Sequence, residues 1–190
     1  MHRASVMLRP ARPTDAAAIA DLVAMADPKS IGGLTGIEDP VQAMEAFRAL
    51  IRGRSGIASH LYARVFEEAG RPIGVVVAYP GRLVVGPSVP AEARVTEADE
   101  FYIDNVAVFP EHRGRGIARR LIVSAETAAR GNGFPAVSLI VDERNLAARG
   151  LYEKLGYAVS GRAVVRGESF HRMRKPLVAE QTAPRAAALA

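Results

Sequence analysis

The sequence predicts a mixed α/β fold in one globular domain, and two observations support this. The chain has 190 residues, of which 49% are hydrophobic, enough for one core but too few for two domains of ordinary size. Short runs rich in β-branched residues alternate with segments whose apolar residues recur every three to four positions, as in amphipathic helices. We expect one domain over residues 1–177 and a disordered tail at residues 178–190.

The first part of the chain predicts a strand, a helix and a loop. Residues 6–8 are apolar and form a short strand, and Thr14 or Asp15 is placed to cap the helix that follows. That helix should end near Asp27. Residues 30–36, SIGGLTG, are rich in glycine and predict a loop.

A second helix and a hairpin come next. Asp39 followed by Pro40 is typical of an N-cap and a first helical turn. Residues 60–68 and 72–80 are rich in strand-forming residues and are joined by an Ala-Gly-Arg turn, which predicts a hairpin. The polar stretch 81–98 contains two prolines before its end and predicts a surface loop.

The second half predicts strands and helices in alternation. Residues 101–110 form a strand that Pro110 ends, and a glycine-containing turn leads into a helix with apolar residues at helical spacing. After another strand at residues 136–142, Asn145 is placed to cap a helix that Gly156 ends in the left-handed conformation. Two further strand-like runs complete the domain, at residues 156–167 and 169–177.

The positive charge of the chain comes almost entirely from arginine. The formal net charge is +5 and the isoelectric point is near 10.0, whereas the only lysines are Lys29, Lys154 and Lys175. Such a surface favours ligands that carry phosphate or other acidic groups. A nucleic-acid-binding module is one alternative, but aromatic residues for base stacking make up only 6% of the chain and tryptophan is absent. We therefore do not expect nucleic acid as the partner.

The residue composition also excludes several kinds of site and intermediate. The chain contains no cysteine, which excludes disulfides, thiolate metal sites and a covalent acyl-cysteine intermediate. Its histidines, His2, His60, His112 and His171, lack the spacing of metal ligands, so no metal cofactor is expected. The sequence shows neither a signal peptide nor an apolar stretch of ~20 residues, so we expect a cytoplasmic protein with no membrane partner.

Residues 113–118, RGRGIA, mark the junction between a strand and a helix. The start of a helix presents unpaired backbone N–H groups and the positive end of the helix dipole, which together suit a diphosphate. Gly114 and Gly116 would leave these amides accessible, and Ala118 would keep the first turn thin. On the pattern alone, a glycine turn flanked by solvated arginines is an equally good interpretation.

Two segments together resemble the signature motifs of the GNAT superfamily of acyl-CoA-dependent N-acetyltransferases. Residues 113–118 resemble its acyl-CoA-binding motif, Q/R-x-x-G-x-G/A. Residues 145–157, NLAARGLYEKLGY, resemble its second motif, N-x-x-A-x-x-L-Y-x-x-x-G-[FY]. The motifs stand in the family's order with a predicted strand between them. The resemblance covers about residues 5–177, and its specific motifs occupy residues 104–157.

The resemblance implies a particular α/β (α+β) architecture, the GNAT fold. This is a central mixed, mostly antiparallel sheet of six to seven strands with about four helices, splayed between the fourth and fifth strands. The acyl-CoA arm lies between the splayed strands in that family. The backbone of Val106, Ala107 and Val108 is therefore expected to pair with the pantetheine amides as an added strand would. These residues are equally typical of a plain core strand, and both interpretations can hold together.

The same resemblance implies which residues bind acetyl-CoA. The diphosphate would lie on the amides of the glycine turn and the first helical turn, and the second motif would contact the cofactor from the later helix. Besides the strand residues above, the implied set is Arg113, Gly114, Arg115, Gly116, Ile117, Ala118, Arg119, Asn145 and Tyr152. Asn145 also fits a helix cap with no other role.

Tyr152 is the residue we expect to act as general acid. Leu151 and Leu155 are four residues apart and should face the sheet, which leaves Tyr152 on the flank of that apolar stripe. Its hydroxyl could then reach the sulfur of the thioester. Without the resemblance, a tyrosine packed at the sheet edge with its hydroxyl in water is the better interpretation.

An amine acceptor also calls for a general base. An alkyl ammonium of pKa ~10.4 is mostly protonated at pH 7, so freeing its lone pair costs about 4.6 kcal/mol. Candidates for the base are Glu100, Asp104 and His171, acting directly or through water. Carboxylates at strand ends are more often solvated surface groups, so this assignment stays open. With no cysteine available, direct attack in a ternary complex is expected.

The sequence identifies the acceptor only by chemical class. The resemblance implies that an amine-bearing small molecule, peptide or protein enters opposite the CoA arm, near residues 31–36, 81–98 and 168–171. An acyl-CoA-binding protein without transferase activity is a second hypothesis, and a basic nucleic-acid-binding module a third. The sequence leaves a homodimer open.

Overall fold

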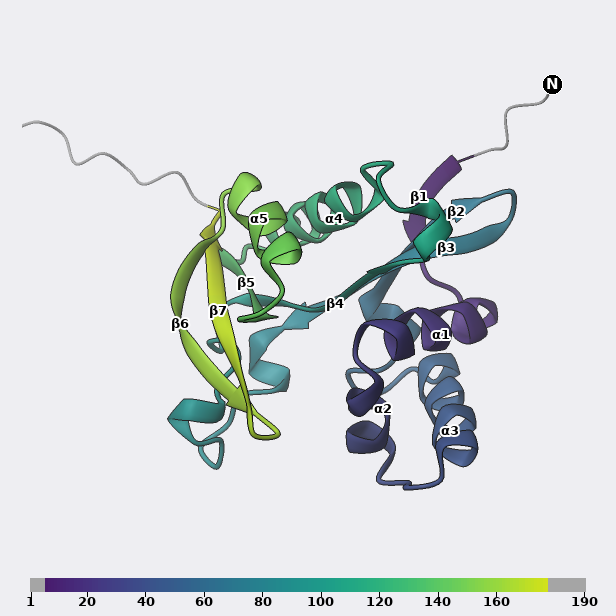
Figure 1. The fold of residues 1–190 in the computed structure, drawn as a ribbon, viewed down its shortest axis with the longest axis horizontal. Helices are drawn as coiled ribbons and strands as arrows, with labels where there is room; N and C mark the ends of the chain where they lie inside the picture. Colours follow the sequence, from purple (N-terminus) through teal and green to yellow (C-terminus); the bar gives the residue numbers. More distant parts are fainter. Residues whose placement is uncertain (1–5, 178–190) are drawn as a thin grey trace, which may run out of the picture.

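Seven strands form a single sheet at the centre of the protein (Figure 1), in the order β1-β2-β3-β4-β5-β7-β6. The computed structural model describes residues 6–177, so the predicted tail at 178–190 lies outside the described residues. All neighbouring strands are antiparallel except β4 and β5, which are parallel. The strands are β1 (Val6–Pro10), β2 (Ala63–Glu68), β3 (Arg71–Pro80), β4 (Phe101–Val108), β5 (Ala136–Asp142), β6 (Ala158–Val165) and β7 (Glu168–Pro176).

Helices lie on both sides of this sheet. In Figure 1, α1 to α3 lie on one side of β4, and α4 and α5 lie on the other. No described helix combines the length and the apolar character needed to cross a membrane. The helices are α1 (Ala16–Ala26), α2 (Pro28–Thr35), α3 (Pro40–Arg52), α4 (Ile117–Gly131) and α5 (Leu146–Lys154).

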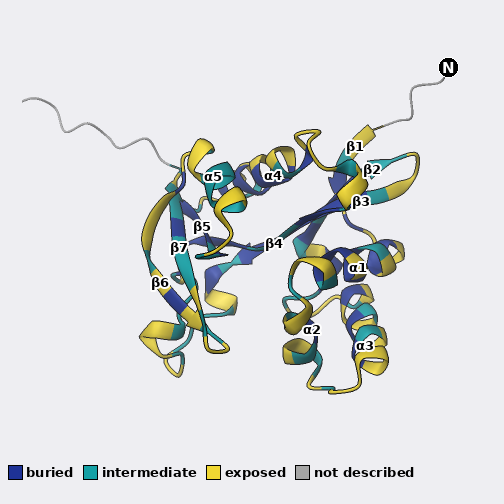
Figure 2. Ribbon diagram, viewed as in Figure 1, coloured by how far each residue is buried: buried dark blue, intermediate teal, exposed yellow. Residues whose placement is uncertain are grey.

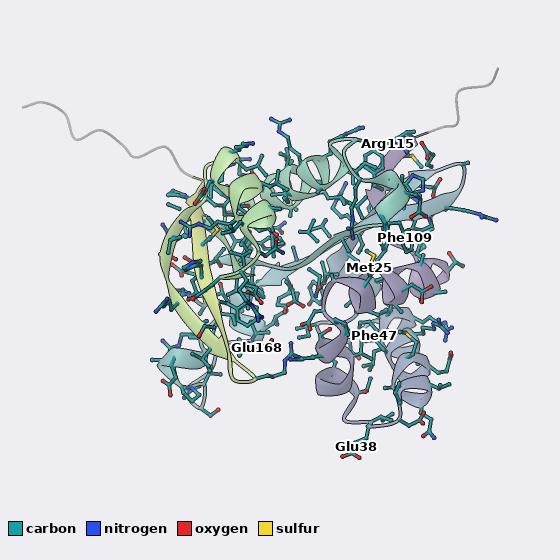
Figure 3. All side chains as sticks on the ribbon, viewed as in Figure 1. Met25, Glu38, Phe47, Phe109, Arg115 and Glu168 are labelled. Carbon is teal, nitrogen blue, oxygen red and sulfur yellow. The ribbon has the colours of Figure 1, made fainter. Side chains whose placement is uncertain are left out.

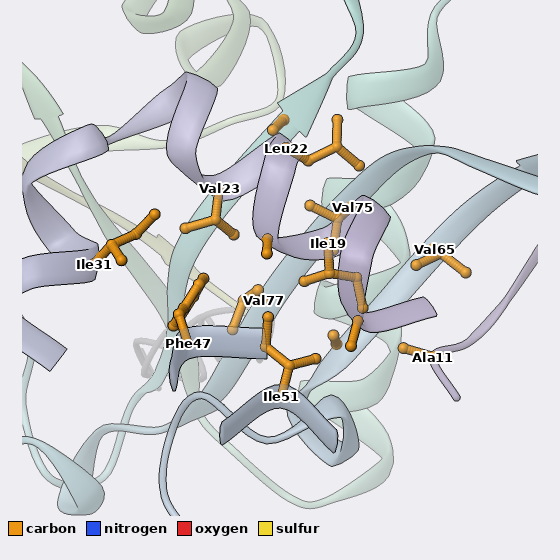
Figure 4. Packing of buried hydrophobic residues seen from close by; sticks show 14 of the residues in the cluster. Ala11, Ile19, Leu22, Val23, Ile31, Phe47, Ile51, Val65, Val75 and Val77 are labelled. Carbon is orange, nitrogen blue, oxygen red and sulfur yellow. The ribbon is translucent and has the colours of Figure 1, made fainter. Parts of the chain in front are cut away.

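The sheet separates two apolar cores. Successive side chains of β3 alternate between them, because side chains in a strand point to opposite faces in turn. Val75 and Val77 pack with Ile19, Phe47 and the other residues of the first core (Figure 4). The intervening residues of β3 pack beneath α4 in the second core. Burial is therefore concentrated in the strands and on the inward faces of the helices (Figure 2).

The loop predicted at residues 30–36 is wrong, because most of the SIGGLTG segment is helical and lies in α2. The carboxylate of Asp27 caps this helix by accepting a hydrogen bond from the Lys29 amide at 3.2 Å, and Pro28 occupies the first turn. Ile31 is buried against the neighbouring helices. A good cap and one buried anchor outweigh the low helix propensity of two internal glycines. The described residues thus contain five α-helices, one more than the approximate number expected.

Asp15 occupies the predicted N-cap position of α1 but does not cap it by a side-chain hydrogen bond, because its carboxylate accepts from the Arg12 amide and pairs with Arg9. The remaining capping predictions are confirmed. Asp39 accepts a hydrogen bond from the Gln42 amide at 2.8 Å at the start of α3. Asn145 accepts one from the Ala148 amide at 3.1 Å at the start of α5. Gly156 follows α5 with a φ of +90°, the left-handed conformation expected of it.

The segment between β3 and β4 forms the expected loop, with two short 3-10 turns at Gly81–Leu83 and Ala91–Ala93. Its end is tied firmly to the sheet. Gly81 donates its amide hydrogen to the Glu100 carbonyl at 2.8 Å, and the hydroxyls of Thr96 and Ser138 are 2.6 Å apart in a buried position. This loop therefore sets where β4 begins.

We expect Gly81→Ala to destabilise the protein by about 3 kcal/mol, because an added Cβ would collide with the carbonyl oxygen of Glu97. Gly86→Ala is the matched control, because it lies in the same loop and its Cβ would meet no atom within 4 Å. Urea denaturation of both variants measures the difference. Equal stability of the two would contradict this close packing.

Candidate active site

The parallel strands β4 and β5 pair over only three residues and then separate. The pairs join Phe101 to Val137, Tyr102 to Ser138 and Ile103 to Leu139. Beyond Ile103, β4 continues along β3 while β5 continues along β7 (Figure 1). The predicted splay between the fourth and fifth strands is therefore present. Within the part of the chain that the structure describes, this leaves the edge of β4 that faces β5 without a strand partner from Asp104 onward.

A β-bulge occurs in β4 where the strands separate. Val77 pairs with Asn105 and Ala78 pairs with Ile103, so Asp104 has no partner in β3. It also has none in β5. A bulge bends the strand and redirects a side chain, and bulges are frequent beside active sites. The β-bulge therefore determines the position of Asp104.

The three residues after the bulge, Val106, Ala107 and Val108, belong to the unpaired edge. Each is paired with β3 on its other side, so the segment is held in extended form. Ala107 and Val108 are buried, as the core-strand interpretation expected. Their free backbone groups can accept an extended ligand as an additional strand.

The turn before α4 presents a row of unpaired amides. Within residues 6–177, the six backbone N–H groups from Gly114 to Arg119 have no hydrogen-bond acceptor, and the first helical hydrogen bond runs from the Arg120 amide to the Gly116 carbonyl at 3.2 Å. Gly114 and Gly116 both have a φ of +73°, and a Cβ at either position would point into open space. This arrangement is a concave set of donors at the positive end of a helix, suited to an anion.

Two arginines of the motif brace this turn. The Arg113 Nε donates to the Val108 carbonyl at 3.1 Å, which joins the turn to the end of β4. Arg115 forms an ion pair with Glu68 of the β2–β3 hairpin, with an Nη1 to Oε2 distance of 3.2 Å. It lies at the right of the view in Figure 3. The arginines at 113 and 115 thus hold the loop in shape.

Tyr152 lies on α5 at the edge of the second core. Its ring packs edge-on against that of Tyr157, with centroids 5.9 Å apart. Burial raises the pKa of Tyr152 to about 12. Its hydroxyl therefore stays protonated at neutral pH and is available as a hydrogen-bond donor.

Asp104 lies on the opposite side of the sheet, where it lines a cavity with residues of α1 and α3. Burial raises the pKa of this carboxyl to about 6, although the Tyr79 hydroxyl and the Asn105 side chain hydrogen-bond to it and act in the other direction. A base whose pKa is close to neutral suits proton transfer near pH 7.

Tyr102 lies close to both Asp104 and Tyr152. It lies two residues before Asp104 on β4, and its hydroxyl is so deeply buried that its pKa is raised. The nearby carboxylate of Asp104 raises that pKa further, and Tyr152 also lies near enough to influence it. The strand gap thus brings the predicted acid and one predicted base close to the same tyrosine. The sequence analysis missed this residue, although its position on the same face as Asp104 could have indicated it.

Glu100 occupies a different environment from Asp104. It is only 3% exposed, and its Oε1 accepts a hydrogen bond from Arg174 at 2.6 Å. Burial alone would raise the pKa of Glu100, but the Arg174 guanidinium and the Ser138 hydroxyl hold it below its ordinary value. A carboxylate with this strong partner is poorly suited to accept a proton, so the geometry favours Asp104 over Glu100 as the base.

His171, the third candidate base, lies on β7. Its Nε2 is 3.4 Å from a guanidinium nitrogen of Arg149, and its Nδ1 is buried without a hydrogen-bond partner among the described residues. It pairs with Val141 of β5 and Arg162 of β6. Among residues 6–177, no cluster of three His, Asp or Glu side chains could hold a metal ion.

Two ion pairs link α2 and its N-cap to the turn between β6 and β7. Arg166 contacts Asp27 at 2.7 Å, and Lys29 contacts Glu168 at 2.7 Å. In Figure 3, Glu168 lies at the tip of this hairpin, facing α2. Asp27 and Arg166 both influence the pKa of Asp104, so these pairs lie beside the catalytic candidates on the side from which an acceptor was expected.

Comparison with known proteins bears on the fold and the family of this chain. The model of the acetyltransferase (GNAT) family matches residues 31–157. Peptidyl-lysine N-acetyltransferase YjaB of Salmonella typhimurium is 33% identical over 88 residues, which are 42% of this chain and 57% of that protein. The match thus covers less than two thirds of that relative's length.

Solved structures share the fold over most of its length. An N-acetyltransferase from Staphylococcus aureus Mu50 is 25% identical with a TM-score of 0.70, and the match covers 88% of this chain and 99% of that one. YncA of Salmonella typhimurium, solved with its cofactor acetyl-CoA, is 21% identical with a TM-score of 0.59, covering 95% and 98% of the two chains. Because the family model matches well over half of the sequence, the chain belongs to the acetyltransferase (GNAT) family.

Proposed function

We propose that this protein transfers the acetyl group of acetyl-CoA to a primary amine by direct attack in a ternary complex. The observation that carries the proposal is the row of unpaired amides from Gly114 to Arg119, which begins a few residues after the unpaired edge of β4. An anionic group and an extended, amide-bearing arm can bind such a surface together. Acetyl-CoA has both.

In this proposal the diphosphate binds the amides of the turn, and the pantetheine arm pairs with Val106, Ala107 and Val108. Gly114 and Gly116 fit this role because no side chain blocks the amides and their φ values suit glycine. Asn145 caps α5 through its side-chain oxygen, which leaves its side-chain nitrogen Nδ2 to donate to the cofactor. The structure of YncA with acetyl-CoA supports this choice of cofactor for the shared fold.

The acceptor amine approaches from the side of α1 and α2. Its nitrogen attacks the thioester carbonyl carbon, so that a C–N bond forms and the C–S bond breaks. Asp104 receives the proton of the amine, directly or through a water molecule. With a base pKa near 6 and an ammonium pKa of ~10.4, complete transfer is uphill by about 6 kcal/mol in the ground state. Deprotonation is therefore favourable only as the C–N bond forms.

Tyr152 acts on the departing sulfur. A thiol has a pKa of ~8.5, whereas burial raises the pKa of Tyr152 to about 12. Full transfer of the tyrosine proton to sulfur is thus unfavourable, and the hydroxyl stabilises the thiolate mainly as a hydrogen-bond donor. The CoA thiolate can then take its proton from solvent.

The charges beside Asp104 support an acceptor that arrives as a cation. Asp27 and Glu168 carry carboxylates near the proposed entrance, each held by a basic partner. An amine arriving as an ammonium can compete for these carboxylates. The relative YjaB is a peptidyl-lysine N-acetyltransferase, which supports a lysine-like amine on a small molecule, peptide or protein. A cytoplasmic location and a homodimer remain predictions.

The alternative, a binding protein without transferase activity, requires different residues in the site. It requires no base, yet Asp104 carries a costly raised pKa in the strand gap, which favours catalysis. A thiol-release assay with acetyl-CoA and a panel of amines separates the two. Binding of acetyl-CoA without thiol release for any amine would support the alternative.

We expect Gly116→Val to weaken acetyl-CoA binding by at least about tenfold, because the new side chain would cover the amides of the turn. Gly133→Val is the matched control: its φ is +76°, its Cβ would also meet open space, and it lies beyond the far end of α4. Both variants carry the same backbone strain, about 1–2 kcal/mol. Calorimetric titration with acetyl-CoA measures the affinities. If both variants bind it equally well, the cofactor does not use this turn.

We expect Tyr152→Phe to lower kcat by about 10- to 100-fold with little change in the KM for acetyl-CoA, because only the hydrogen bond to the departing sulfur is lost. Tyr157→Phe removes the hydroxyl of the neighbouring ring and should leave kcat unchanged. Steady-state kinetics with an amine that the parent protein accepts measures both. An unaltered kcat in Tyr152→Phe would rule out this hydroxyl.

We expect kcat/KM for the acceptor to rise with pH through about 6, as Asp104 loses its proton. Asp104→Asn should abolish this inflection and most of the activity. The same variant should be more stable than the parent by about 1–2 kcal/mol at pH 8, because the buried charge is costly only above its raised pKa. The gain should vanish near pH 4, where the carboxyl is protonated.

Glu100→Gln is the matched control for this experiment. Arg174 holds the pKa of Glu100 below its ordinary value, so Glu100→Gln should destabilise the protein at pH 8 and keep the inflection near pH 6. Denaturation curves and pH–rate profiles of both variants test the assignment. A profile that loses its inflection in Glu100→Gln and keeps it in Asp104→Asn would reverse the roles.

A further inference from the structure

A groove of about 460 Å³ runs between the outer face of α4 and the first two strands. A volume of this size is typical of pockets that hold small organic ligands. Its lining combines three guanidinium groups with apolar side chains and two hydroxyls. The lining residues are Leu8, Arg64, Arg119, Arg120, Val123, Ser124, Thr127 and Ala128.

The three arginines of this groove carry uncompensated charge. Among residues 6–177, Arg64, Arg119 and Arg120 form no ion pair, whereas Arg115 and Arg130, on either side of Arg119 and Arg120 along the chain, are paired with glutamates. The positive charges in the groove are thus available to a ligand.

One of these guanidinium groups is partly buried, and another is stacked on an aromatic ring. The Nε of Arg64 is buried and has no hydrogen-bond partner among the described residues. The guanidinium of Arg120 lies over the ring of Phe66, 4.7 Å from its centroid. Stacking occupies its face and leaves its N–H edge free. A stacked arginine loses less side-chain entropy when it binds an anion.

The groove lies on the opposite flank of α4 from α5 and β7. Glu126 of α4 faces that other flank, where Lys175 of β7 contacts it at 2.7 Å. Ser124 and Ala128 face Leu8 and Arg64 of β1 and β2. The proposed thioester site, with Tyr152 on α5, is therefore separated from the groove by the body of α4.

We propose that this groove binds a small organic phosphate. The phosphoryl oxygens accept hydrogen bonds from Arg64 and Arg120, and the organic part packs over Leu8 and Val123. Arginine binds phosphate through two parallel N–H donors, which gives it preference over other cations for this ligand. Ser124 and Thr127 add hydroxyls at the rim. This second site does not depend on the proposed transferase activity.

Calorimetric titration with uridine 5′-monophosphate tests the site, because this probe carries a phosphomonoester and lacks the adenine of CoA. It is run on the protein with and without saturating CoA. We expect one equivalent to bind in both cases. Inorganic phosphate should bind more weakly, because it makes no contact with the apolar floor.

Two variants test whether the probe binds in the groove. Arg64→Met keeps the aliphatic stem and removes the charge, and Thr127→Glu adds a carboxylate at an exposed helical position. Each should weaken binding of uridine 5′-monophosphate by about tenfold or more. Arg54→Met removes an equal charge from an exposed site outside the groove and should have no effect.

The proposal is overturned by any of three results: no binding of the nucleotide, binding that both groove variants retain, or binding that saturating CoA abolishes. The last result would assign the nucleotide to the cofactor site. Equal affinity for inorganic phosphate would exclude the organic part of the proposal. Circular dichroism of each variant verifies that its fold is retained.

Discussion

The candidate site depends on the early separation of β4 from β5. A strand that pairs on both edges has no backbone group left for a ligand, so the three-residue pairing that ends at Ile103 is what makes β4 a binding edge. The bulge at Asp104 coincides with this separation. The same strand then leads, through Arg113 bound to the Val108 carbonyl, into the turn whose amides are unpaired. One irregular strand therefore positions the cofactor edge, the anion site and the candidate base.

The electrostatics of the chain make Asp104 exceptional. Other buried carboxylates have close basic partners: Asp15 contacts Arg9 at 2.7 Å, and Glu126 contacts Lys175 at 2.7 Å. Such partners offset the cost of removing a charge from water. Among residues 6–177 Asp104 forms no ion pair, the Tyr79 hydroxyl and the Asn105 side chain beside it are neutral, and burial raises its pKa to about 6. This poorly compensated carboxyl lies at the gap in the sheet, where the proposed proton transfer would use it.

Local sequence patterns predicted the elements well, because caps and strand propensities act over a few residues. Asn145 and Asp39 cap the expected helices. The SIGGLTG segment was predicted wrongly, since two glycines concealed a helix that depends on the burial of Ile31. The candidate bases could not be ranked from sequence. Glu100 and Asp104 look alike there, and the difference comes from Arg174, 74 residues from Glu100 along the chain. Contacts of that separation leave no local signal.

The positions proposed for the acid, Tyr152, and the base, Asp104, require a gap that is open to both faces of the sheet. Asp104 faces the core beneath α1 and α3, and Tyr152 packs at the edge of the core beneath α4. In a continuous sheet, paired backbone would separate them, and no reacting carbonyl could contact both. With β4 and β5 apart, the proposed amine could reach the carbonyl carbon from one face while the sulfur departs towards the other. The proposed direct attack needs both substrates in the site together, and a gap open to both faces meets that requirement.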